Sequence, residues 1–430
     1  MNQLPTEPRE KRYPIIVVSM VMAFMLYLHR VCLSEIAKND AFRQDLDLSK
    51  ERIGEILGAF FFTYALCQVP AGWFSDRWGA RRMLTGYIFG WSALTAVTGL
   101  VTGPLGILWA RLGVGVTQAG AYPTSSGVVR HWFSVSERGR ASSMISIGGR
   151  LGGALSPLIT ATLIIYLGGW RATLLFFGGA GCLAAVAYYW IVRDRPAHPP
   201  GSQTVAQFEA KATARHQQKA SFRTVLSLCA TSRNLWLNAL AQFSINLGWA
   251  FLITWLPSYL KDVKQVESSR GALLVTIVLA MGIVGQFMGG WVADLSVRTF
   301  GLRFGRVLPI TVGTWAAGFA YFGCISFDSV TAVVICCAIV SLMNDIANPS
   351  IWAFIQDIGG RSTASFFGWG NMWGNLGAAT LAVILPYLMK WGEASGYGQS
   401  VVFWFCGGAF LLAGLCALGM NPTRPVDPLS

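Results

Sequence analysis

The stretch Gly72-Trp-Phe-Ser-Asp-Arg-Trp-Gly-Ala-Arg-Arg82 places a glycine, an acid and a basic cluster at the end of an apolar segment. Four nearby positions recur with the same spacing about half a chain later: Gln68, Gly72, Trp73 and Asp76 correspond to Gln286, Gly290, Trp291 and Asp294. A repeat displaced by half the chain predicts two similar halves. Glycine lets two helices approach closely, and a carboxylate at a helix end pairs with arginine or with the positive N-terminus of a neighbouring helix. We therefore expect a latch between helices at one side of the molecule.

The composition indicates an integral membrane protein. Apolar residues make up 53% of the chain and charged residues 12%, and the mean hydropathy is +0.49, whereas charged residues form about 25% of a soluble domain. Runs of about 20 apolar residues are long enough to cross a bilayer as helices. The sequence contains twelve, at approximately 14–37, 53–74, 83–101, 104–128, 141–165, 171–192, 235–260, 271–293, 306–325, 329–355, 363–389 and 399–420.

Basic residues predict the orientation of these spans. If the loops alternate sides, most of the 33 Lys and Arg residues lie on the side of the N-terminus. Cytoplasmic loops are enriched in Lys and Arg, so we expect both termini in the cytoplasm and the protein in the cell (inner) membrane. The first run is too long for a cleavable signal and should remain as a span. The charge of +13 is dispersed over short loops, which argues against nucleic-acid binding.

Nine cysteines raise the question of disulfides or metal. Most lie within apolar runs, and none forms a Cys-x-x-Cys pair with a histidine nearby, so they are interpreted as small apolar residues. We expect no metal site and no cofactor. No nucleophile and base, metal set or nucleotide loop is recognisable, which argues against an enzyme.

The chain divides at a polar stretch that begins with Arg193-Asp-Arg-Pro. We predict an N-terminal six-helix bundle over 1–193, a cytoplasmic linker over 194–234 and a C-terminal six-helix bundle over 235–430. The segment from Thr204 to Lys219 is either a helix on the membrane surface or a solvated connector. In a protein of two such halves, substrate binding is expected near the bilayer midplane between them.

The opening motif resembles the signature loop between the second and third helices of the major facilitator superfamily. Its spacing, Gly-x3-Asp-Arg-x-Gly-x-Arg-Arg, is formed by Gly72, Asp76, Arg77, Gly79, Arg81 and Arg82. The second copy is degraded after Asp294, which that superfamily tolerates. The resemblance implies an all-α membrane protein with twelve transmembrane helices in a 6+6 pseudo-symmetric fold. It also implies a gating role for these residues and for Gly290 and Asp294.

Further segments resemble the anion:cation symporter branch of this superfamily. That branch includes sugar-acid permeases for galactonate, glucarate and hexuronates, and the vesicular glutamate and sialic acid carriers. The similar segments are spread over nearly the whole chain: 111–123, 132–133, 137–141, 255–260, 349–353, 357–361 and 370–377. The resemblance implies a carrier of organic anions.

Ionisable residues within predicted spans are costly and are therefore candidates for function. Three are arginines, Arg30, Arg111 and Arg150, and the only deep acid is Asp345. A guanidinium binds a carboxylate or phosphate through two parallel hydrogen bonds, so this excess of positive charge predicts an anionic substrate. The alternatives are that Arg111 bonds loop carbonyls and that Arg150 pairs with Asp345 or with backbone.

The segment Tyr27-Leu-His29-Arg30 aligns with a Tyr-x-Asp-Arg pattern of proton-coupled relatives. Gln118 falls where several relatives carry a Glu, so both acids implicated there in proton coupling are absent. His29 is a candidate replacement because histidine titrates near neutrality. Burial and the adjacent Arg30 disfavour the charged ring, so a neutral, hydrogen-bonding histidine is the alternative.

Asp345 is the other candidate for coupling. Pro349 follows it in the same span, and the carboxylate could hold H⁺ or Na⁺ together with freed backbone carbonyls; the alternative is a structural pair with Arg150. Four amides on two later spans could bond substrate hydroxyls or could bridge helices: Gln242, Asn246, Asn371 and Asn375.

Together these features predict a secondary transporter, monomeric in the bilayer, that moves an organic carboxylate anion by alternating access. A sugar acid such as a hexuronate or aldonate is the leading substrate class, with H⁺ or Na⁺ as a coupling partner. Two alternatives stay open: an organophosphate/phosphate antiporter, and a sensor that keeps the fold without transporting.

Overall fold

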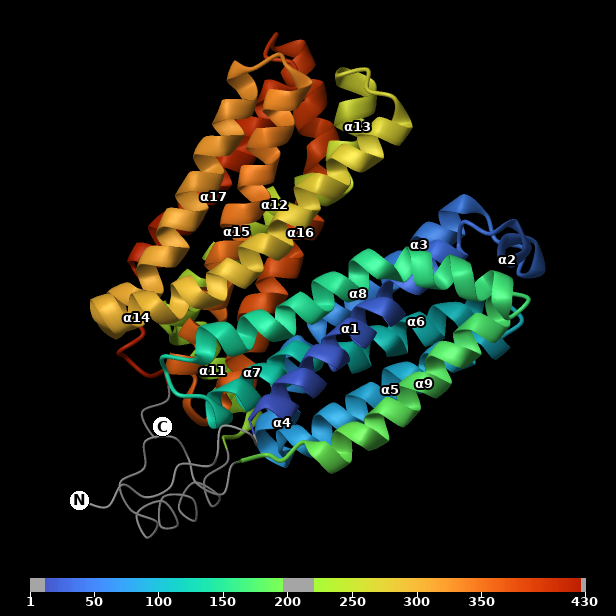
Figure 1. Ribbon diagram of the computed structural model, residues 1–430, viewed down its shortest axis with the longest axis horizontal. Coiled ribbons are helices and arrows are strands. Elements are labelled where there is room, and N and C mark those ends of the chain that lie inside the picture. Colours follow the sequence, from blue (N-terminus) through green and yellow to red (C-terminus); the bar gives the residue numbers. More distant parts are fainter. Residues whose placement is uncertain (1–11, 196–219, 427–430) are drawn as a thin grey trace.

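A computed structural model describes residues 12–195 and 220–426. Its described part consists of helices without strands, arranged as two elongated bundles (Figure 1). The first bundle contains α1 (Tyr13–Ile36), α2 (Asp40–Asp45), α3 (Lys50–Leu66), α4 (Gln68–Trp78), α5 (Ala80–Leu100), α6 (Pro104–Gln118), α7 (Ala121–Trp132), α8 (Arg138–Tyr166) and α9 (Trp170–Ile191).

The second bundle follows α11 (Phe222–Thr231), a short helix inside the predicted linker. It contains α12 (Arg233–Thr254), α13 (Leu256–Ser258), a π-helical turn (Tyr259–Val263), α14 (Ser268–Ser326), α15 (Val330–Ile358), a 3₁₀ turn (Gly360–Ser362), α16 (Thr363–Ala394) and α17 (Ser400–Leu418). The surface helix considered for 204–219 lies outside the described residues. The end of the linker contacts the first bundle, because the Trp73 indole donates to the Ala220 carbonyl at 3.0 Å.

Every predicted apolar run has a helical counterpart. Within the described ranges nine helices are long and apolar enough to cross a membrane, and α3 with α4 forms a further span bent by 49°. Two of the twelve predicted runs fall on α14, which is counted once among the nine, and one run falls on the interrupted helix α6 and α7. α6 and α7 are separated at Ala119 and Gly120, while α14 joins the runs 271–293 and 306–325 through Gly301 (φ 73°). Glycine adopts that positive φ without a Cβ clash, so the chain can turn there.

The two bundles contact each other near the end of the molecule where the described residues begin, at 12, and end, at 426, which we call the terminus side. There α4, α7 and α8 pack against α14, α15 and α16. The bundles diverge toward the opposite end, where α2 and α13 lie (Figure 1). The structure is therefore closed at the terminus side.

The repeated glycines lie at this contact. A Cβ on Gly72 in α4 would be 2.5 Å from the Ala364 carbonyl oxygen of α16. A Cβ on Gly290 in α14 would be 2.8 Å from the Cβ of Ser143 in α8. Each glycine thus lets a helix of one bundle approach a helix of the other, as the repeat led us to expect.

We predict that Gly72→Ala lowers the melting temperature of the detergent-purified protein. The added methyl group meets the α16 backbone, and overpacking of this kind costs about 1–3 kcal/mol. Gly86→Ala in α5 is the matched control, because nothing lies within 4 Å of its Cβ position and alanine favours a helix over glycine. Equal melting temperatures for the two variants would contradict the prediction.

Candidate functional site

Asp76 connects α4 of the first bundle to the start of α16 in the second. Its carboxylate accepts hydrogen bonds from the backbone N–H groups of Ala364 at 3.1 Å and Ser365 at 2.9 Å. The Ser365 hydroxyl donates to the same carboxylate at 2.6 Å. The negative charge therefore lies at the positive end of the α16 dipole and satisfies free N–H groups there.

Asp294 makes the corresponding connection in the opposite direction. It lies in α14 and accepts from the N–H groups of Gly139 at 2.8 Å and Arg140 at 3.1 Å, at the start of α8. The Arg140 side chain adds an ion pair, with Nε 2.9 Å from the carboxylate. Both repeated acids thus bond the N-terminus of a helix in the other bundle, and Asp294 also pairs with an arginine.

The basic end of the motif is anchored within the first bundle. Gly79 has φ of 93°, and a Cβ there would lie 2.8 Å from the Asp194 carboxylate. Asp194 accepts from the Arg81 N–H at 2.7 Å, and the Arg81 guanidinium lies 4.0 Å from the ring centre of Tyr189. Arg77 and Arg82 are exposed. Sequence reasoning missed Asp194, because it was grouped with the linker.

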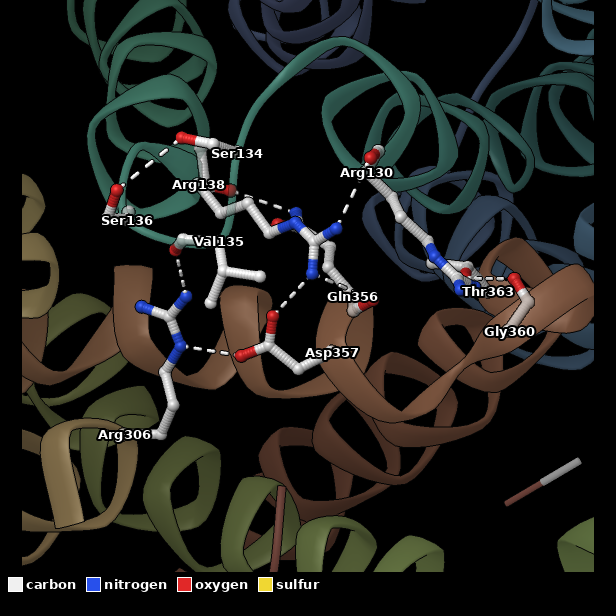
Figure 2. A network of polar contacts seen from close by, with 12 residues as sticks. Arg130, Ser134, Val135, Ser136, Arg138, Arg306, Gln356, Asp357, Gly360 and Thr363 are labelled. Atoms are coloured by element: carbon white, nitrogen blue, oxygen red, sulfur yellow. Dashed lines mark hydrogen bonds and ion pairs between the residues drawn. The ribbon is translucent and has the colours of Figure 1, made fainter. Parts of the chain in front are cut away.

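A second network across the bundles was also missed. Asp357 of α15 accepts from Arg138 of α8 through one oxygen and from Arg306 of α14 through the other, at 2.7 Å for Arg306 (Figure 2). Arg306 also donates to the Val135 carbonyl at 2.6 Å. One buried acid therefore joins two arginines and both bundles. The sequence marked Asp357 only as part of a family segment, because its partners are distant along the chain.

Arg130 extends the same network. It donates to the Thr363 hydroxyl at 2.9 Å, and its own carbonyl accepts from Arg138 at 3.3 Å (Figure 2). Thr363 is the first residue of α16, so this contact lies beside the Asp76 bond. The terminus side is consequently held closed by a continuous set of polar contacts.

Arg30 of α1 lies in an aromatic cage closer to the middle of the spans. Its guanidinium carbon is 4.7, 5.0 and 4.4 Å from the ring centres of Tyr27, Phe60 and Tyr64. Its Nε donates to Gln118 at 3.3 Å, while Nη2 is buried without a hydrogen-bond partner in the described part of the chain. No described acid forms an ion pair with it. Aromatic faces stabilise the cation without neutralising it.

Arg111 of α6 contacts the backbone of Arg30. It is 4% exposed, donates to the Arg30 carbonyl at 3.3 Å and stacks 5.2 Å from the Phe60 ring centre. Gln118 donates to the Leu26 carbonyl at 3.1 Å and accepts from Arg30. In this conformation Arg111 bonds a backbone carbonyl of helix α1, not the loop carbonyls considered from the sequence, and Gln118 orients the Arg30 side chain.

Arg150 and Asp345 form an ion pair between the bundles. Arg150 of α8 donates to Asp345 of α15 at 2.6 Å and lies 4.8 Å from the ring centre of Trp249. Asn344 donates to the same carboxylate oxygen at 3.0 Å, and the other oxygen has no described partner. In this conformation Arg150 and Asp345 therefore pair with each other, which was the alternative to substrate and cation binding. The Arg150 side chain is 24% exposed and that of Asp345 is fully buried.

His29 points away from this region. It is fully buried in the first bundle, 3.3 Å from the Thr95 hydroxyl and with its ring 6.0 Å from that of Phe177. Neighbouring residues of a helix point about 100° apart, so His29 and Arg30 face different surroundings. This placement favours a neutral, hydrogen-bonding histidine.

The four candidate amides make different contacts: Asn371 links the two bundles, and the others bond or pack within the second bundle. Asn371 of α16 donates to the Gln68 side chain of α4 at 2.7 Å, which links the bundles. Asn246 and Asn375 donate to carbonyls one turn earlier in their own helices, at 2.8 and 2.7 Å. Gln242 packs against α16, where its amide nitrogen lies next to Gly370.

A layer of aromatic side chains lies between the closed-end contacts of Asp76 and Asp294 and the side chains of Arg30 and Arg150. The Tyr122 ring of α7 lies 5.1 Å from Trp352 of α15, and Trp352 lies 4.7 Å from Phe367 of α16. Tyr122 also lies 6.4 Å from Tyr27 and contacts Gly149, next to Arg150. The caged Arg30 and the Arg150–Asp345 pair therefore border one region between the bundles.

Two pseudo-repeated helical bundles with charged side chains between them define a secondary transporter. The sequence model of the Major Facilitator Superfamily matches residues 16–382, and the chain belongs to that superfamily.

Relatives match over nearly their full length. The chain is 27% identical over 422 residues to a probable sulfoacetate transporter of Cupriavidus necator, covering 97% of this chain and 95% of the relative. It is 26% identical over 417 residues to the D-galactonate transporter of Escherichia coli, covering 91% of each. The solved fucose:proton symporter of E. coli matches with a TM-score of 0.73 at 14% identity, over 95% of this chain and 98% of that one, which shows a shared fold.

We predict that Asp357→Asn strongly destabilises the closed terminus side. Asp357 is 2% exposed and Arg306 fully buried, and neutralising one partner of a buried ion pair costs about 3–5 kcal/mol. The melting temperature should fall, and hydrogen exchange at the start of α8 should become faster. Asp328→Asn, at an exposed site, is the matched control. Unchanged exchange in Asp357→Asn would contradict the prediction.

Proposed function

We propose that this protein carries an organic carboxylate anion of the sugar-acid class across a bacterial-type cytoplasmic membrane, coupled to a cation. Both termini lie in the cytoplasm in this proposal, following the distribution of Lys and Arg residues. The closed end of the structure is then the cytoplasmic end. Rocking of the two bundles about the central site would open each side in turn.

The observation that carries the proposal is the uncompensated guanidinium of Arg30. A buried charge is normally paired, because leaving it unpaired costs several kcal/mol. Arg30 has aromatic neighbours and an amide, and its Nη2 lacks a described partner. A carboxylate offers two acceptor oxygens that match the guanidinium fork. The site is therefore prepared for an anion that arrives from solution.

Neighbouring groups suit a hydroxylated acid. Tyr27 and Gln118 contact Arg30 directly, and Gln242, Asn246, Asn371 and Asn375 supply amides on the opposing helices. Arg111 adds positive charge next to Arg30, although it bonds the backbone in this conformation. Relatives named for sulfoacetate and galactonate support the assignment, since both compounds carry a carboxylate.

The Arg150–Asp345 pair is our candidate for cation coupling. A negative interior opposes anion entry by about 2.3 kcal/mol per charge for each 100 mV, so accumulation requires a compensating ion. The pair joins α8 to α15 at 2.6 Å and leaves one Asp345 oxygen free of described partners. A proton or Na⁺ at Asp345 would release Arg150, which could then interact with the substrate. His29 contacts Thr95 and Phe177 of its own bundle, whereas Asp345 pairs across the bundles, so we assign the coupling role to Asp345.

We predict that Arg30→Lys abolishes substrate binding in a folded protein, because an ammonium lacks the planar fork. The measurement is the melting-temperature shift given by galactonate, glucuronate, sulfoacetate, glycerol 3-phosphate and neutral galactose. Arg303→Lys, exposed at the closed end, should bind like wild type. Stabilisation of wild type by glycerol 3-phosphate alone would favour a phosphate carrier, and wild-type affinity in Arg30→Lys would refute the Arg30 site.

For coupling, we expect Asp345→Asn to lose concentrative uptake into liposomes under an imposed pH or Na⁺ gradient. It should retain exchange of labelled for unlabelled substrate, since exchange needs no net ion movement. His29→Asn should retain both activities. Gradient-driven uptake that persists in Asp345→Asn would exclude it as the coupling site, and binding without exchange in wild type would identify a sensor.

A further inference from the structure

A pocket of about 470 Å³ opens on the outside of the molecule near the closed end, away from Arg30. It lies between the start of α1, the start of α8 and the first half of α14, so both bundles form its walls. Its lining includes Arg12, Glu137, Arg140, Trp291 and Arg298. The transport mechanism above makes no use of this pocket.

One end of the pocket is basic. Its lining contains three arginines and one acid, Glu137, which lies 3.6 Å from Arg12 and also accepts from the Ser134 hydroxyl. The Arg12 Nε is buried and has no hydrogen-bond partner among the described residues. Arg140 is bonded through its Nε to Asp294, which lies behind it and is 3% exposed. The pocket therefore presents a net positive charge.

The other end is apolar and open to the surroundings of the bundles. Val17, Phe287 and Trp291 line it and are 55%, 55% and 57% exposed. In a membrane protein such side chains meet the acyl chains of lipid. The Arg140 guanidinium lies 5.0 Å from the Trp291 ring centre, at the junction of the two ends. A basic cleft that continues into an apolar surface matches an amphiphile with a negative head.

We propose that this pocket binds the headgroup of an anionic phospholipid, with its acyl chains along α1, α8 and α14. The phosphate interacts with Arg12 and Arg298, and the lipid bridges the two bundles. Basic pockets between transmembrane helices are recognised sites for anionic headgroups. The pocket shares Arg140 with the Asp294 contact, so the bound lipid stabilises the conformation that is closed at the terminus side.

The test is lipid binding to purified protein in detergent, followed by native mass spectrometry with phosphatidylglycerol and phosphatidylcholine. Wild type should bind phosphatidylglycerol more tightly. The variant Arg12→Gln/Arg298→Gln should bind it roughly 25-fold more weakly, at about fivefold per arginine. Arg303→Gln is the matched control, because Arg303 is exposed on the same helix but does not line the pocket. Melting temperatures establish that each variant is folded.

A second measurement, the quenching of tryptophan fluorescence, tests the same pocket without changing its arginines. Dibrominated phosphatidylglycerol should quench wild-type tryptophan fluorescence more than it quenches Trp291→Phe, and dibrominated phosphatidylcholine should show no such difference. Equal binding of the two lipids, or an unaffected double variant, would overturn the proposal. Displacement of the lipid by equimolar glycerol 3-phosphate would assign the pocket to a soluble phosphate instead.

Discussion

The structure depends on carboxylates of each bundle that bond the free N–H groups at the N-terminus of a helix in the other bundle. Asp76 holds the start of α16 and Asp294 holds the start of α8. These interactions satisfy N–H groups that a helix cannot satisfy itself. In the proposed mechanism these bonds would break and reform as the two bundles rock. The glycines beside them permit the approach that the bonds require.

Closure at the terminus side fixes the arrangement of the aromatic layer and of the Arg150–Asp345 pair in the central region. With the terminus side held, the layer of Tyr122, Trp352 and Phe367 lies between the latch and the arginines. The Arg150–Asp345 pair then bridges the bundles above that layer. An anion that competes for Arg150 would weaken a contact between the halves at the place where it binds. In the proposed mechanism this one ion pair would connect substrate binding to rearrangement of the bundles.

The helical architecture could be predicted from the sequence, whereas the hydrogen-bond and ion-pair partners of the charged residues could not. Apolar length alone predicted twelve spans, and the repeat predicted the close contacts of Gly72 and Gly290. Asp76 bonds the start of α16, which is distant along the chain. No local sequence pattern predicts that these two segments meet. The bonds from Arg138 and Arg306 to Asp357 join distant segments for the same reason. His29 was considered together with Arg30 because they are adjacent, yet the helix turns them toward different surroundings.

Among the described residues, Arg30 differs from three arginines at the closed end in the groups that surround its guanidinium. Arg138, Arg140 and Arg306, at the closed end, each pair with an acid that also joins the bundles, which is the arrangement of a structural contact. Arg30 instead has aromatic rings and one amide, which hold the guanidinium in place but leave its charge uncompensated. Maintaining such a group in a low-dielectric region is costly, and a bound anion would offset that cost. The absence of a neighbouring described acid therefore distinguishes Arg30 from the arginines at the closed end, whereas Arg150 is paired with Asp345 in this conformation.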